Sequence, residues 1–89
     1  MLLPPTLTVE QAAAALRALP ADGSAGVIDA SALREFDSSA LALLLQAARL
    51  ARSAGRGFEV QGAPPKLVQL AQLYGVAELL GLARQGADA

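Results

Sequence analysis

The sequence contains no cysteine and no histidine. Without cysteine the chain cannot form a disulfide, an iron–sulfur cluster or a thiolate nucleophile. Without histidine it lacks the commonest general base and the usual zinc sites. We therefore expect no catalytic residue, no metal site and no cofactor. The absence of cysteine also fits a reducing compartment.

Aromatic residues and net charge are scarce as well. The chain has 89 residues, of which 54% are apolar, but only one tyrosine and two phenylalanines. The core must therefore consist mainly of leucine, alanine and valine, and a domain of this size is marginally stable without a partner. Seven basic and eight acidic side chains give a net charge of −1. This excludes the basic field that nucleic-acid binding requires.

Long hydrophobic runs are also missing. The longest uncharged runs reach about half of the roughly 20 residues that a membrane span needs. The first residues, "MLLPPTLT", carry no positive side chain, and two prolines follow only two leucines. This pattern is unlike a signal peptide. We expect a soluble, cytoplasmic chain that reaches a membrane only by docking on an embedded partner.

Strand patterns alternate with helix patterns along the chain. The prolines of "LLPPTLT" remove ladder donors, which indicates a short extended segment at a sheet edge. "GVIDAS" is a short apolar run typical of a buried strand, and "GFEVQG" alternates apolar and polar residues as a strand does. We interpret "ALREF" between them as a connecting loop.

Three helices are predicted. The first covers 9–19, begins with a capping box at Thr8 and stops at Pro20. The second runs from Ser38 or Ser39 to about residue 54 and ends in glycine. The third begins at the proline pair of "APPKLVQLAQLYG" and ends at Gly75. "VAELLGLAR" is a last short helix or turn, and 85–89 is a frayed tail.

This order of elements predicts an α/β domain spanning 1–89. Strands that alternate with helices imply crossover connections and a mixed or parallel sheet. So few residues cannot cover both faces of two or three strands. We therefore expect helices on one face of a small sheet with a shortened N-terminal strand.

The second helix has an unusually wide apolar surface. One stripe contains Leu41, Leu44, Leu45 and Ala48. A second stripe beside it consists of Ala40, Leu43, Ala47, Leu50 and Ala51. Together they exceed the stripe of about 100° that a surface helix buries. Either the alanines simply fill the helix, or the second stripe, with Ala40, Leu43 and Ala47, is a partner surface.

Three polar residues, Asp37, Ser38 and Ser39, open this helix. Each can accept a hydrogen bond from the unpaired N–H groups of a helix N-terminus. One cap is enough, so a spare hydroxyl remains where negative charge is stabilised. The three residues therefore suit a cap, a phosphorylation site or a polar contact to a partner.

The segment "VIDASALREFDSSALALLLQAARLARSAGRGFEVQGAPPKLVQLAQLYGVAELL" resembles a STAS domain, the family of anti-sigma factor antagonists. The shared pattern is a strand ending in Asp-x-Ser, a short loop, Asp-Ser-Ser-small-Leu, a long helix, Gly, a strand and a Pro-led helix. The resemblance is strongest over 26–82. "DSSALALLL" and "LYGVAELL" are most similar to the branch of MlaB, the STAS subunit of the MlaFEDB phospholipid-transport ABC system.

The resemblance implies a small mixed sheet with helices on one face and no catalytic activity. In the MlaB-like branch it implies a subunit that binds the ATPase subunit MlaF through the region of Ser38. In the antagonist branch it implies that a kinase phosphorylates Ser38 and that the partner is an anti-sigma kinase. We expect the first role, peripheral to the inner membrane, and keep the second as the alternative.

Two departures from the family pattern stand out. The family usually has glycine where this chain has Ala40, which makes a partner's approach there less close. The N-terminal strand is shortened, which leaves an edge that a partner or a second copy could cover, so a homodimer is an open alternative. An enzyme is the third possible class of function. A serine nucleophile needs a base, and no spacing places Lys66, the sole lysine, near Ser38.

Overall fold

The structure is a computed structural model that describes residues 1–82, so the tail predicted at 85–89 lies outside the described residues. In chain order the elements are β1 (Thr6–Leu7), α1 (Val9–Ala18), β2 (Val27–Asp29), β3 (Glu35–Phe36), α2 (Ser38–Ser53), β4 (Glu59–Gln61) and α3 (Pro65–Leu73). The predicted helices and the two predicted strands are confirmed within one or two residues at each end.

The strands pair in parallel, as the alternation with helices predicts. β2 pairs with β4, with Ile28 opposite Val60, and β1 pairs with β3. The first residues add a bridge between Leu2 and Asp29, so this segment runs beside β2. The predicted short extended segment is therefore present and lies at a sheet edge.

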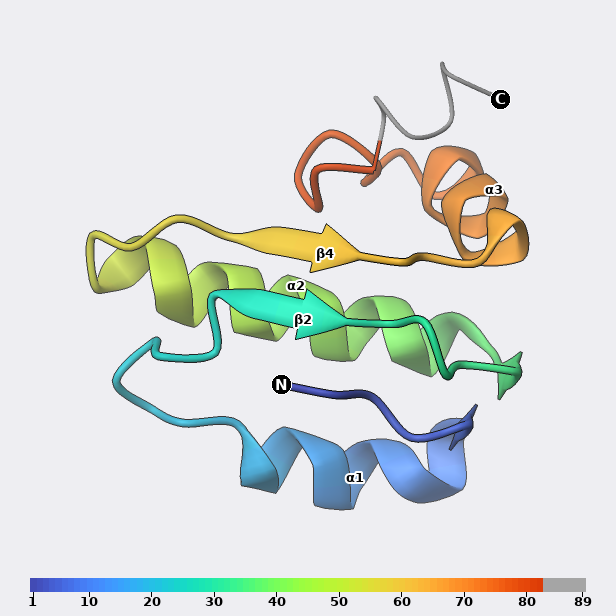
Figure 1. Ribbon diagram of the computed structural model, residues 1–89, viewed down its shortest axis with the longest axis horizontal. Coiled ribbons are helices and arrows are strands. Elements are labelled where there is room, and N and C mark those ends of the chain that lie inside the picture. Colours follow the sequence, from blue (N-terminus) through green and yellow to red (C-terminus); the bar gives the residue numbers. More distant parts are fainter. Residues whose placement is uncertain (83–89) are drawn as a thin grey trace.

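Helix α2 lies behind β2 and β4 (Figure 1). Successive residues of a strand point to opposite faces, so each strand buries one face only. Ile28 and Val60 are buried, whereas Val27 and Glu59 on the other face are exposed. The predicted α/β class, with helices on one face of a small sheet, is confirmed.

One predicted loop is wrong. Residues 35 and 36, within "ALREF", form β3 and pair with Thr6 and Leu7 of β1. The pairing partner lies far away in the sequence, and a two-residue strand has no periodicity of its own to reveal it. The strand holds the chain in an extended form just before α2 begins.

The capping box predicted at Thr8 is present. The side-chain oxygen of Gln11 accepts from the Thr8 N–H at 3.0 Å and from the Thr8 hydroxyl at 2.6 Å. These bonds satisfy donors at the N-terminus of α1 that have no partner within the helix.

Candidate functional site

The first turns of α1, α2 and α3 all lie toward the end of the molecule to which β2 and β4 point (Figure 1). Each helix directly follows a strand of a parallel pair, so their N-termini gather at the carboxyl edge. Helix N-termini carry unpaired N–H groups and a positive potential. This end therefore favours acceptors and negative charge. It contains Asp37, Ser38 and Ser39, which we call the α2 tip.

Asp37 is the N-cap of α2, and its carboxylate accepts two backbone hydrogen bonds. Oδ1 accepts from the Ser39 N–H at 2.8 Å, and Oδ2 accepts from the Val9 N–H at 3.2 Å. The hydrogen bond from the Ser39 backbone is the main reason that the pKa of Asp37 lies below its ordinary value. The cap interpretation is thus confirmed for Asp37.

The two serines of the α2 tip differ in their hydroxyl groups. Within residues 1–82 the Ser38 hydroxyl makes no hydrogen bond, whereas a side-chain hydrogen bond from Ser39 contributes to the lowered pKa of Asp37. Ser38 is exposed and Ser39 is half-buried. A free hydroxyl at the first helical position can donate to or accept from a partner, or accept a phosphoryl group. Contact with a partner here stays a prediction.

The turn after β2 lies toward the same end. The Asp29 carboxylate accepts from the Ser31 N–H at 2.9 Å and from the Ser31 hydroxyl at 2.6 Å. The hydroxyl bond is the main cause of the lowered pKa of Asp29. A Cβ on Gly62, whose φ is +66°, would lie 2.9 Å from the Ser31 Cβ. Glycine therefore allows the exit of β4 to pass directly beside this turn.

A groove lies next to the α2 tip, because Phe36, the residue before Asp37, is one of its lining residues. It has a volume of about 320 Å³ and is lined by Phe36, Lys66, Gln69, Leu70 and Leu73. Leu73 is 80% exposed, and the neighbouring Tyr74 is 57% exposed. The groove therefore has apolar walls with one ammonium group among its lining residues. Contiguous exposed apolar patches are typical of protein-interaction surfaces.

The sequence did not predict this groove. Leu67 and Ala71 of α3 are buried, whereas Leu73 and Tyr74 are exposed. The signal in the sequence was an apolar residue, Leu73, away from the buried face of the helix. The position of Phe36 in the groove was not predicted, because the sequence analysis interpreted the residues of β3 as a loop.

The prediction that Ala40, Leu43 and Ala47 form an exposed partner surface is wrong. Their exposed fractions are 0%, 1% and 2%. The physical reason is that α2 is covered from two directions. The sheet lies on one side and α1 packs on another, so the chain itself buries the wide apolar surface. In this fold a partner can reach the α2 tip but not the second stripe.

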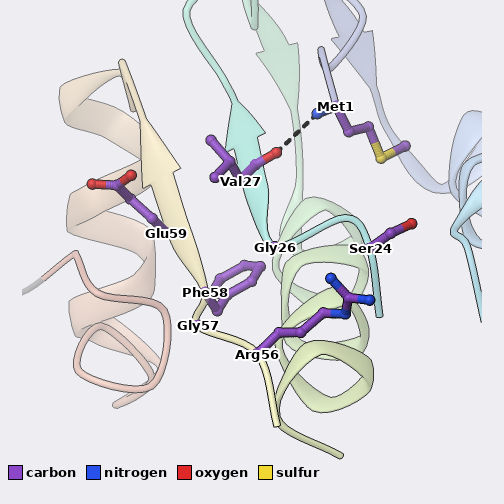
Figure 2. A pocket seen from close by; sticks show the side chains of 8 residues that line it. All are labelled: Met1, Ser24, Gly26, Val27, Arg56, Gly57, Phe58 and Glu59. Carbon is purple, nitrogen blue, oxygen red and sulfur yellow. Dashed lines mark hydrogen bonds between the residues drawn. The ribbon is translucent and has the colours of Figure 1, made fainter. Parts of the chain in front are cut away.

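A second and larger pocket lies near the start of β2 and the end of α2 (Figure 2). It has a volume of about 610 Å³ and is lined by Met1, Ser24, Gly26, Val27, Arg56, Gly57, Phe58 and Glu59. The Met1 amino group donates to the Val27 carbonyl at 2.8 Å. The lining mixes apolar groups with charges of both signs. Ser38 is the first residue of α2, whereas Arg56 and Gly57 of this pocket follow its last turn, so the two sites are separate.

A family model described as "Mlab, STAS domain" matches residues 6–81. The chain belongs to this STAS family. No curated protein and no solved structure gives a significant match. The resemblance carried by "DSS" and the Pro-led helix is thus confirmed at the level of the family.

STAS domains mediate protein–protein interactions. In this STAS domain the exposed Ser38 and the groove at Leu73 are the features that suit such a contact. No helix within residues 1–82 is long and apolar enough to cross a lipid bilayer.

Proposed function

We propose that this STAS domain is a non-enzymatic subunit that binds and stabilises the ATPase subunit of an Mla-type phospholipid-transport ABC transporter. In this role it serves the maintenance of outer-membrane lipid asymmetry, and it reaches the inner membrane from the cytoplasm through the complex. The family description supports the transporter branch. One observation carries the contact itself: Ser38, with its free hydroxyl, lies at the same end as an exposed apolar groove.

The groove and the α2 tip together form the docking surface. Interfaces draw most of their binding energy from a few apolar or aromatic side chains in a desolvated centre, with polar groups at the rim. Leu73 and Tyr74 supply the apolar centre. Ser38 and Lys66 supply a hydroxyl and a cation at the rim. A matching ATPase surface would offer an apolar side chain with an acidic group beside it.

Co-purification with the ATPase subunit tests this proposal. Leu73→Asp places a charge in the centre of the surface, and we expect at least about a tenfold loss of affinity. The matched control is Leu16→Asp, because Leu16 is also an exposed leucine near the C-terminal end of a helix, but on α1. An intact complex with Leu73→Asp would contradict the docking surface. Loss of the complex with both variants would indicate a folding defect instead.

The alternative is an anti-sigma factor antagonist that a kinase switches at Ser38. The free, exposed hydroxyl of Ser38 favours this role, because nothing in residues 1–82 competes for it. A phosphate there would add about −1.5 to −2 charges in the positive field of the α2 N-terminus. Incubation with an anti-sigma kinase and ATP, followed by mass spectrometry, distinguishes the two roles. One phosphate that disappears in Ser38→Ala would favour the alternative.

A further inference from the structure

Helix α1 packs against α2 but buries few of its own side chains. Its sequence is VEQAAAALRA, and Ala12 is its one buried residue. Val9 is 69% exposed and Leu16 is 37% exposed. A buried methyl group contributes only about 0.8 kcal/mol. Polar contacts at its N-terminus therefore add to the packing that holds α1 in place.

One of those contacts crosses to another helix. The Asp37 carboxylate caps α2 through Ser39 and also accepts from the Val9 N–H, which belongs to the first residue of α1. The two residues are 28 positions apart in the sequence. A single carboxylate thus serves the first turns of two helices, one acceptor oxygen for each. The Gln11 side chain of the capping box accepts from Thr8 and leaves the Val9 N–H to Asp37.

We propose that Asp37 is a positioning residue for the docking surface: it ties the first turn of α1 to the α2 tip and so fixes the exposed Val9 side chain beside Ser38. This inference rests on the proposed function, and it extends the docking surface to α1. Val9 is a neighbour of Ser38 through two links, the hydrogen bond to Asp37 and the peptide bond from Asp37 to Ser38. An apolar side chain held there adds to the contact that Leu73 provides.

Asp37→Asn separates the two tasks of the carboxylate. The asparagine side chain keeps one acceptor oxygen, and asparagine caps helices as well as aspartate does. It can therefore still accept from Ser39, while its amide group cannot accept from Val9. Val9→Pro removes the same bond from the donor side. Proline is favoured at the first helical position, and Thr8 before it already has an extended backbone at φ −103° and ψ −175°.

The matched control is Asp22→Asn. Asp22 accepts from the Ser24 N–H at 2.9 Å in the turn after α1. The chemical change is the same, but the variant leaves the α2 tip untouched. We expect it to change neither backbone exchange in α1 nor binding.

Backbone amide exchange measured by NMR, together with affinity for the purified ATPase subunit, tests the inference. In Asp37→Asn we expect the Val9 amide to exchange about tenfold faster, the Ser39 amide to stay within about twofold, and the affinity to fall about tenfold. In Val9→Pro we expect faster exchange in the rest of the first turn of α1 and a similar loss of affinity.

Two results would overturn the inference. One is unchanged exchange at Val9 in Asp37→Asn. The other is faster exchange at Val9 with affinity equal to that of the unmodified chain. If the unmodified chain fails to bind the ATPase subunit, the proposed function fails, and the exchange data alone still decide whether Asp37 holds α1.

Discussion

At the scale of single residues, the pattern Asp-x-Ser recurs three times with the same local geometry. It occurs at 22–24, 29–31 and 37–39, and each time the aspartate Oδ1 accepts from the serine N–H two residues on. Such a side chain replaces a backbone acceptor in a turn. Hydrogen bonds that these serines donate are the main cause of the lowered pKa of Asp22, Asp29 and Asp37.

These lowered pKa values predict how stability depends on pH. A carboxylate whose pKa is lower in the folded chain stabilises the fold above its unfolded pKa of about 3.9. That contribution is lost as the pH falls through the folded pKa. We therefore expect the melting temperature, followed by circular dichroism, to be level between about pH 7 and 5 and to fall below about pH 4.

The comparison is with a variant in which all three aspartates are replaced by asparagine. Asparagine keeps one acceptor but does not titrate, so this variant should show a shallower fall in acid. Equal acid dependence of both chains would show that these three carboxylates do not contribute.

At the scale of the elements, α2 is a buried helix with an exposed tip. Of its residues, those that lie buried are Ala40, Leu41, Leu43, Leu44, Ala47, Ala48 and Ala51. The exposed ones include Ser38 and Ala42. The apolar width of α2 therefore reflects burial on two sides rather than a surface kept for a partner.

Two leucine substitutions separate packing from docking. Leu43→Ala removes a side chain that is 1% exposed and should lower the free energy of unfolding by about 2–5 kcal/mol. Leu73→Ala removes a side chain that is 80% exposed and should change that free energy by less than about 0.5 kcal/mol, while weakening the ATPase contact. Urea titration measures both. Equal destabilisation by the two variants would contradict the burial described here.

The sequence predicts elements with local signals and misses those that depend on distant partners. The Asp37 cap, the proline start of α3 and the alternation in β4 are all visible within a few residues. β3 is visible only through its pairing with Thr6 and Leu7. The bond from Val9 to Asp37 likewise joins residues far apart in the chain. The burial of Leu43 could not be predicted from the apolar stripes of a single helix, because these do not show that α1 and the sheet cover the helix together.

At the scale of the whole molecule, two surfaces lie at opposite ends of α2. One is the proposed docking surface, with Ser38 and the groove at Leu73. The other is the mixed pocket around Arg56 and Phe58 (Figure 2). We propose that the ATPase subunit binds the first of these surfaces. The edge beside Leu2, where a second copy could pair, stays a separate prediction.

NMR mapping on the isotope-labelled chain tests this assignment most directly, because it reports on both ends in one titration. The purified ATPase subunit is added, and amide signals are followed residue by residue. We expect changes centred on Phe36, Ser38, Leu70 and Leu73, and little change at Val27 and Arg56. Changes centred on Val27 and Arg56, with the α2 tip unaffected, would contradict this assignment.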